Sequence, residues 1–334
     1  MWKMPFTKIP KIIQIETTIA CNATCWFCPQ KHATRKPMFM EEKNWKKIID
    51  ETRDLGMIYR PFILNEPFVD KRMEKIIEYI KQDKTAKVEF NTNGEPLTPK
   101  RTDKFIELGV DIMRFSIDGF YKSTFNEARG ISYDKVYSNV KYFLDQSNQS
   151  NKNILTEVRM IKLPGTDKEQ IEFKNYWEQF NPSEIVFTDL YRYPWEGQQS
   201  SIQKPCLKIL DQIFFYVDGR ATLCCWDSKE RQIVGDISTQ SVMEIWDSEI
   251  MKKCRILLDQ GKRDEINLCS RCDAYENLSF DQYLVLFCLI FFAYDFNILP
   301  NQELTRKLGA QAQQFIESQA HASEQCLPAI LGNL

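Results

Sequence analysis

Three cysteines gather near the start of the chain, in the stretch IACNATCWFCPQ (19–30). Cys21, Cys25 and Cys28 are separated by three residues and then by two. A zinc site usually takes four ligands from two paired clusters, whereas three neighbouring thiolates leave a metal centre with one open position. The spacing alone is compatible with half of a zinc site or with a redox cluster. An open position is where chemistry can take place.

A second group of cysteines follows later, around the segment PCLKILDQIFFYVDGRATLCCWD (205–227). Two strand-like runs flank Asp218-Gly219, which predicts a hairpin that brings Cys206 and Cys224 together. The later CSRC adds Cys269 and Cys272, so that four thiolates can enclose one metal centre.

One ligand of this second group is ambiguous from the sequence. Cys225 could replace Cys224, because adjacent strand residues point to opposite faces. A zinc ribbon built from the same four thiols is the alternative to an iron-sulfur cluster. Cys254 has no predicted role. Cys288 and Cys326 lie in the C-terminal tail, and we expect them to act as small apolar side chains and not as metal ligands.

Composition limits the remaining classes. The chain has 334 residues, 43% of them hydrophobic, and a formal net charge of −2 from 44 basic and 46 acidic side chains. This balance favours neither nucleic acid nor an anionic membrane as partner. The N-terminus lacks a signal peptide, and the longest apolar run (284–294) is too short to span a bilayer. We therefore expect a cytoplasmic protein whose 11 cysteines stay reduced, which favours metal binding over disulfides.

The elements that must position the first cysteines are strands and helices in alternation. Apolar runs predict strands over 12–16, 58–64, 87–92, 111–117, 156–161 and 184–188. Helical spacing of apolar residues predicts helices between them, for example over 71–82 and 134–145. Such a βα repeat makes a parallel sheet or barrel with its site at the carboxyl ends of the strands. The first strand runs directly into the cysteine loop.

The CxxxCxxC loop after a first strand resembles that of the radical S-adenosylmethionine (SAM) enzymes, over roughly residues 10–275. The resemblance implies a partial (β/α)6 TIM-like barrel over 1–195. It also implies a 4Fe-4S cluster on Cys21, Cys25 and Cys28 that binds SAM and releases a 5′-deoxyadenosyl radical, which takes a hydrogen atom from the substrate.

Residues at other strand ends match the same family. Strand two ends in NEP, strand three in NTNG, strand four in FSIDG, and the next helix carries NEARG. The resemblance implies that these segments contact SAM, with the Arg129 guanidinium on its carboxylate. The implied cofactor-binding residues are Phe27, Asn65, Glu66, Asn93, Ser116 and Arg129. Asn65 departs from the glycine that is usual at its position.

The second cysteine group resembles the SPASM or shorter twitch extension of these enzymes, here over 196–276 as a β-hairpin plus a helix. The implied ligands of one auxiliary 4Fe-4S cluster are Cys206, Cys224, Cys269 and Cys272. A helical C-terminal tail over 277–334 lies outside the resemblance.

The resemblance fixes the reaction type more closely than the substrate. An auxiliary cluster with four cysteine ligands has no open iron and suits electron transfer, which favours oxidative outcomes. A ribosomally made precursor peptide is the expected substrate, to be crosslinked, epimerised or shortened. No recognition domain precedes the first strand, so we expect a separate peptide-recognition protein, and flavodoxin or ferredoxin as electron donor. The alternatives are a dehydrogenase for a small-molecule alcohol such as an aminoglycoside, and a non-catalytic iron-sulfur or zinc protein.

Overall fold

The computed structural model describes residues 7–190, 206 and 208–272. Six parallel strands form its core, in the spatial order of the sequence. They are β1 (Ile12–Ile15), β2 (Ile58–Arg60), β3 (Lys87–Thr92), β4 (Ile112–Ser116), β5 (Leu155–Lys162) and β6 (Glu184–Asp189). All six predicted strands and the predicted partial barrel are confirmed. The second strand is shorter than predicted, because Pro61 follows it and cannot donate a backbone hydrogen bond.

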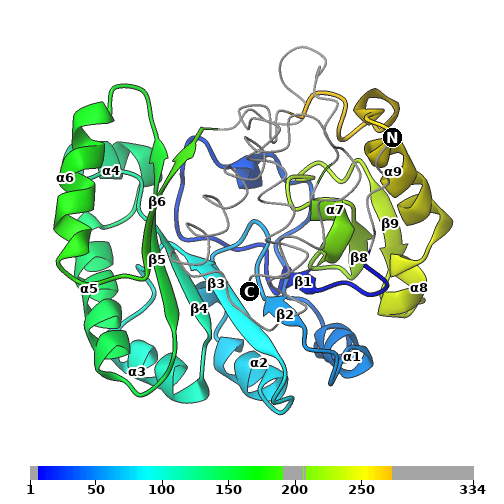
Figure 1. Cartoon of the computed structure of the whole chain (residues 1–334), viewed down its shortest axis with the longest axis horizontal. Helices are drawn as coiled ribbons and strands as arrows, with labels where there is room; N and C mark the ends of the chain where they lie inside the picture. Colours follow the sequence, from blue (N-terminus) through cyan, green and yellow to red (C-terminus); the bar gives the residue numbers. More distant parts are fainter. Residues whose placement is uncertain (1–6, 191–205, 207, 273–334) are drawn as a thin grey trace, which may run out of the picture. The chain divides into compact units, whose positions relative to one another are not determined.

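Six helices lie between these strands in the sequence. They are α1 (Glu42–Glu51), α2 (Met73–Ile80), α3 (Pro99–Leu108), α4 (Lys122–Arg129), α5 (Tyr133–Gln149) and α6 (Asp167–Glu178), with α4 and α5 both between β4 and β5. Helices cover the outer side of the sheet (Figure 1). The apolar residues that predicted α2 are all buried, namely Met73, Ile76, Ile77 and Ile80. Burial of this stripe against the sheet, more than helix propensity, stabilises such a helix.

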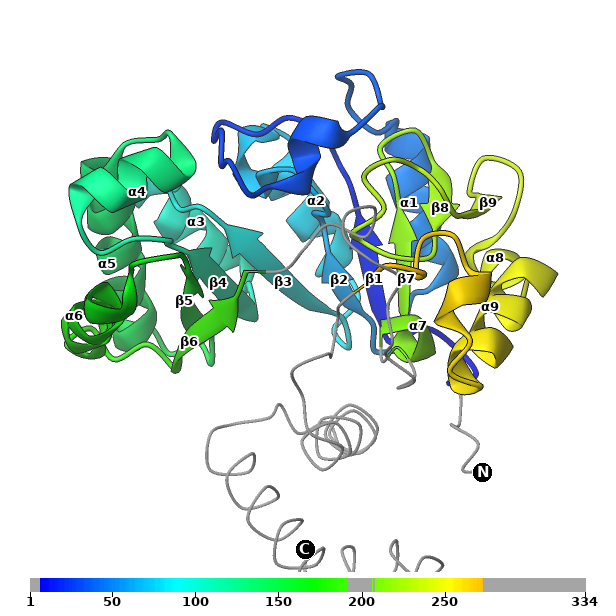
Figure 2. The same ribbon diagram turned by 90° about the horizontal axis from the view of Figure 1, so that it is seen from above.

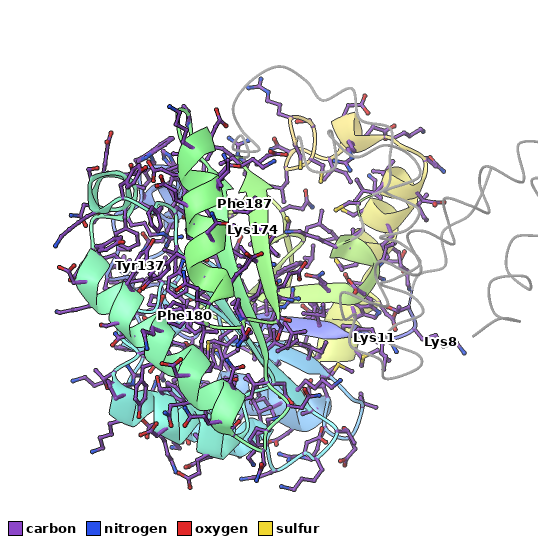
Figure 3. The ribbon with its side chains drawn as sticks, turned by 60° about the vertical axis from the view of Figure 1, so that its left-hand side comes forward. Lys8, Lys11, Tyr137, Lys174, Phe180 and Phe187 are labelled. Atoms are coloured by element: carbon purple, nitrogen blue, oxygen red, sulfur yellow. The ribbon has the colours of Figure 1, made fainter. Side chains whose placement is uncertain are left out.

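Aromatic side chains fill the layer between α5, α6 and the edge strand β6. The rings of Tyr137 and Trp177 lie 5.0 Å apart, and Phe187 of β6 lies 5.9 Å from Phe173. Figure 3 shows Tyr137, Phe180 and Phe187 on this side of the sheet. Such close aromatic pairs add to the stabilisation that burial gives.

The inner face of the sheet is polar and charged. Arg60 of β2 pairs with Glu89 of β3 at 2.9 Å, and Arg114 of β4 pairs with Glu157 of β5 at 2.9 Å. These residues share one face because side chains alternate along each strand and the strands are in parallel register. The sheet therefore has an apolar outer side under the helices and a polar inner side.

The C-terminal part adds three strands to the same sheet and also contains further helices. It comprises α7 (Lys208–Asp211), β7 (Gln212–Phe215), β8 (Arg220–Thr222), β9 (Ile233–Asp236), α8 (Val242–Trp246) and α9 (Glu249–Asp259). The predicted hairpin is confirmed, because β7 and β8 are antiparallel and Gly219 between them has a φ of +94°. The sequence did not predict that β7 pairs in parallel with β1, Ile13 opposite Ile213, which gives one nine-stranded sheet.

Some expectations concern parts of the chain that the structure does not describe. The proposed boundary near 195, the tail over 277–334, Cys288 and Cys326 all lie outside the described residues. Among the helices that are described, none has the length and apolar character that crossing a membrane requires.

Candidate functional site

The first cysteine cluster lies on a long loop that leaves the carboxyl end of β1. The loop is closed at its base where Thr18 bridges Phe39 and Met40 N donates to Thr17 O at 2.9 Å. Figure 2 shows this loop, in blue, between α4 and the β8–β9 hairpin. The cluster therefore stands at the strand ends where barrels of this kind carry their active sites.

The three thiols are free, half-buried and held by the local backbone. Ala23 N donates to Cys21 Sγ at 3.4 Å, and Gln30 N donates to Cys28 Sγ at 3.5 Å. Burial raises the pKa of the Cys21 thiol to about 12. Because metal ligands must be deprotonated, metal binding here would release protons.

Three hydrogen bonds fix the loop to the barrel. Asn22 Nδ2 donates to Glu95 Oε2 at 2.6 Å, and Asn93 Nδ2 donates to Asn22 Oδ1 at 2.9 Å. Thr24 N donates to the carbonyl oxygen of Arg129, at the end of α4, at 2.9 Å. Asn93 thus lies beside the cysteine loop and holds it through Asn22.

Glu66 lies at the site but its carboxylate is engaged within the protein. Its oxygens accept hydrogen bonds from Thr92 Oγ1 at 2.7 Å, from Asn93 N at 2.7 Å and from Phe68 N at 3.2 Å. Burial raises the pKa of Glu66 to about 7. The side chain therefore joins the segment after β2 to the end of β3.

Arg129 lies beneath the loop, in an ion pair with Asp118. Asp118 Oδ1 also accepts a hydrogen bond from Ile161 N at 2.7 Å, which ties the pair to β5. The Phe27 ring centre lies 5.9 Å from the Arg129 guanidinium carbon. Ser116 ends β4, half-buried, on the polar inner face. The sequence placed Asp118 at a strand end but did not identify it as the partner of Arg129.

The residues around the loop fit a bound SAM and cluster. Asn65 Nδ2 and Arg129 Nε are buried donors without a hydrogen-bond partner in the part of the chain that the structure describes. Buried donors of this kind normally have partners, and a carboxylate is a strong one for a guanidinium. The three thiols can hold a cluster with one open iron, and the buried donors beside them can bind a carboxylate. Together they fit a ligand that binds the open iron and carries a carboxylate, as SAM does.

The second cysteine group lies around the hairpin. Trp226 N donates to Cys224 Sγ at 3.5 Å, and Cys272 N donates to Cys269 O at 3.1 Å in a tight turn. The pKa of Cys224 is raised most by its hydrogen bond with Cys225 and by burial, and the charge of Cys206 raises it further. The pKa of Cys269 is raised most by burial and then by the charge of Cys206. These three thiols are therefore neighbours.

Cys225 lies beside the same thiols: burial lowers the pKa of Lys208, and the charges of Cys225, Cys224 and Cys206 raise it. Lys208 Nζ donates to Cys225 Sγ at 3.3 Å. The hydrogen bond from Cys224 lowers the pKa of Cys225, as do the charges of Lys208 and Arg60. Cys206, Cys224, Cys269 and Cys272 remain the predicted ligand set, with Cys225 as the alternative to Cys224. Cys254 is buried in α9. Within residues 7–190, 206 and 208–272, no three cysteine, histidine or carboxylate side chains are arranged to hold a single metal ion.

Comparison with known proteins gives two family matches. The model of the radical SAM superfamily matches residues 15–173, and that of the SPASM iron-sulfur cluster-binding domain matches residues 206–273. The S-adenosyl-L-methionine-dependent 2-deoxy-scyllo-inosamine dehydrogenase of Niallia circulans is 24% identical over 287 residues, 83% of this chain and 98% of that protein. The mycofactocin maturase of Mycolicibacterium smegmatis is 27% identical over 36% of this chain and 31% of its own length.

Solved structures share the fold. The complex of BtrN with AdoMet and 2-DOIA has a TM-score of 0.57 at 20% identity and covers 81% of this chain and 94% of its own. Native anSMEcpe with bound AdoMet has a TM-score of 0.63 at 13% identity, with coverages of 90% and 99%. Streptococcus suis SuiB bound to precursor peptide SuiA has a TM-score of 0.61 at 13% identity, with coverages of 75% and 67%.

Proposed function

Because the chain belongs to the radical SAM superfamily and carries a C-terminal iron-sulfur cluster-binding domain, we propose that it oxidises an alcohol group of a small molecule. One observation carries the choice of substrate class. The similarity to the 2-deoxy-scyllo-inosamine dehydrogenase extends over 83% of this chain and 98% of that protein. Matches to the mycofactocin maturase and to SuiB cover smaller shares of those chains. The match to anSMEcpe, solved with a Cp18Cys peptide, covers 99% of that chain but at only 13% identity.

The first site would hold a 4Fe-4S cluster on Cys21, Cys25 and Cys28 and a SAM molecule beside it. When bound, the reduced cluster would supply the one electron that SAM must accept to be cleaved into methionine and a 5′-deoxyadenosyl radical. Arg129 would bind the methionine carboxylate, because its Nε is buried and lacks a partner among the described residues. Asn65 Nδ2 is a second such donor.

Four other residues would shape the site around the cofactor. Glu66 and Asn93 hold the strand ends and the cysteine loop together through their hydrogen bonds. Phe27 covers the Arg129 guanidinium and would help to exclude water from the methionine end. Ser116 would contact SAM from the inner face of β4.

Oxidation of an alcohol requires that two hydrogens and no other atoms leave the substrate. The hydrogen on carbon leaves as an atom to the deoxyadenosyl carbon, the hydroxyl proton leaves to solvent or a base, and one electron remains to be removed. Cys206, Cys224, Cys269 and Cys272 would hold an auxiliary 4Fe-4S cluster, whose chemistry is acceptance of one electron. Flavodoxin or ferredoxin would supply the first electron.

A precursor peptide is the second candidate substrate. It is favoured by the likeness in fold to SuiB, solved with a precursor peptide, and by the similarity to the mycofactocin maturase. The same hydrogen abstraction would then act on a peptide carbon, with a separate protein that recognises the peptide.

The test uses the anaerobically reconstituted full chain with SAM, a reductant and 2-deoxy-scyllo-inosamine deuterated at its carbons. Transfer of deuterium into 5′-deoxyadenosine, with formation of a ketone, supports alcohol oxidation. A parallel reaction contains short peptides encoded beside the gene. Deuterium transfer only from labelled peptide would support the second candidate instead.

The control is the variant with Cys21, Cys25 and Cys28 all changed to alanine. It should form no 5′-deoxyadenosine, because no open iron remains to bind SAM. If this variant still cleaves SAM reductively, the proposed site is wrong whichever substrate is used.

A further inference from the structure

Arg35 lies buried in the loop, seven residues after the last cysteine of the first cluster. Its Nε and Nη2 donate to the two carboxylate oxygens of Glu16 at 2.9 and 3.0 Å. Its guanidinium carbon lies 3.9 Å from the centre of the Tyr216 ring, in β7–β8. A planar guanidinium suits this combination of a two-point carboxylate contact and an aromatic stack. Neither contact is used by the cofactor site described above.

The same loop also contacts the segment that follows β8. Arg35 Nη1 donates to Glu230 Oε1 at 3.3 Å, and the neighbouring Thr34 hydroxyl donates to the same oxygen at 2.7 Å. Glu230 has a φ of +56°, which non-glycine residues rarely adopt. Two polar groups of the first loop thus meet one carboxylate of the C-terminal part.

Tyr216 continues the connection to the second cysteine group. Its hydroxyl donates to the carbonyl oxygen of Asp227. Asp227 N donates to Cys224 O at 3.1 Å, and the Asp227 carboxylate accepts from Arg231 N at 2.8 Å and Gln232 N at 2.9 Å. The turn that begins at Cys224 is therefore built on Asp227, and Arg35 stacks on the ring that contacts it.

On the other side, Arg35 is close in sequence to the first cluster. Cys28 caps the 3-10 helix η1 (Pro29–His32), and Thr34 and Arg35 follow it directly. From Cys28, the chain thus leads to Arg35, whose guanidinium stacks on Tyr216. Tyr216 is in turn joined to Cys224 by two hydrogen bonds through Asp227.

We propose that Arg35 is a positioning residue that couples the loop of Cys21, Cys25 and Cys28 to the loop of Cys224–Glu230. Loss of the auxiliary cluster then changes SAM binding at the first site, and this change depends on the contact between Arg35 and Glu230. The inference needs clusters on both cysteine groups, as in the proposed function, but it needs neither of the two substrates.

Arg72 provides a matched control in the same loop system. It pairs with buried Asp70 at 2.8 Å, lies over the Phe39 ring at 4.9 Å, and donates to Met40 O at 2.8 Å and Thr17 O at 2.9 Å. It therefore holds the base of the same loop by the same kinds of contact. All these contacts are inside the barrel part.

The experiment measures SAM affinity and the EPR spectrum of the reduced first cluster in the reconstituted full chain. C269A/C272A removes the auxiliary centre, and it is made in four backgrounds: wild type, E230Q, E16Q/R35M and R72M. In the wild-type background we expect a change in SAM Kd on the order of fivefold, with a changed EPR signal. In E230Q and E16Q/R35M the change should largely disappear, and in R72M it should persist.

E230Q keeps the buried Glu16–Arg35 pair and tests the link even if E16Q/R35M does not fold. The proposal is overturned if C269A/C272A leaves the first site unchanged, or if its effect is the same size in E230Q as in wild type. Absence of any cluster signal from wild type would instead contradict the proposed function.

Discussion

Gly130 lies directly against Thr24. A β-carbon built on Gly130 would lie 2.1 Å from Thr24 Oγ1, and the φ of Gly130 is +66°. Thr24 stands between the first and second cysteines of the loop that β1 leads into, one residue before Cys25. The end of α4 therefore sets how closely the cysteine loop can approach the barrel.

We predict that Gly130→Ala displaces the cysteine loop and lowers the iron content of the first site. Gly109→Ala is the matched control, because Gly109 also ends a helix with φ +81° but has no atom within 4 Å of an added β-carbon. Both variants should lose about 1–2 kcal/mol of stability from the left-handed backbone. Only Gly130→Ala should lose iron, measured by iron analysis and EPR.

Removal of the colliding atom should restore the site. Thr24→Ala in the Gly130→Ala background deletes Oγ1, and the Thr24 β-carbon is 3.5 Å away, an ordinary contact. Iron content should return towards the wild-type value. Equal iron loss in the two glycine variants would show that backbone strain, and not the contact with Thr24, is responsible.

The two adjacent cysteines after β8 should behave differently. Cys224→Ser should abolish the auxiliary cluster, because Cys224 shares its surroundings with Cys206. Cys225→Ser should retain it, because the Cys225 thiol faces Lys208. Iron per chain and Mössbauer spectra of the reconstituted variants distinguish the two. Retention of both clusters in Cys224→Ser would reverse the assignment.

The sequence predicted most of what depends on local pattern. Apolar runs located the strands, and the cysteine spacing located the loop. It did not predict that Ile13 pairs with Ile213, because the partner of a strand 200 residues away is chosen by tertiary packing and leaves no local signal. The Thr24–Gly130 contact was missed for the same reason.

The charged contacts of the site were only partly predictable. Arg129 was identified by its resemblance to a family motif, but its pairing with Asp118 depends on how α4 returns to the sheet. Arg35 carried no motif at all. The role proposed for Arg35 depends on its burial, and the sequence gives no sign that an arginine in a loop is buried.

Arg129→Lys should weaken SAM binding without loss of iron. A lysine ammonium can keep the charge near Asp118 but cannot offer the planar fork to a carboxylate. Loss of one charged hydrogen bond corresponds to about 1.5–3 kcal/mol, or roughly 10-fold to 150-fold in Kd. Equilibrium binding of SAM to the reconstituted variant measures this.

Arg53→Lys serves as the control for this change, because Arg53 pairs with Asp50 at the surface. It should leave SAM affinity unchanged. Wild-type affinity in Arg129→Lys would show that the methionine carboxylate is bound elsewhere.

Asp211 predicts a pH dependence of stability in the metal-free protein. The side chain is buried, and neither carboxylate oxygen has a hydrogen-bond partner among the described residues. Burial raises the pKa of Asp211 to about 7 from its ordinary value of 3.8. The folded chain then keeps a proton that the unfolded chain loses near pH 4. This contribution to stability is complete below about pH 4 and is lost as the pH rises through 7.

Between pH 5 and pH 8 the free energy of unfolding should therefore fall, by on the order of 3 kcal/mol from this group. Asp211→Asn removes this titrating group and should make this part of the profile less steep, while the contribution of Glu66, whose pKa burial also raises to about 7, remains. Urea denaturation of both proteins at several pH values measures the slopes. Because Asn cannot ionise, a variant profile as steep as that of the wild type would assign the pH dependence to another group and show that Asp211 is ionised in the folded protein.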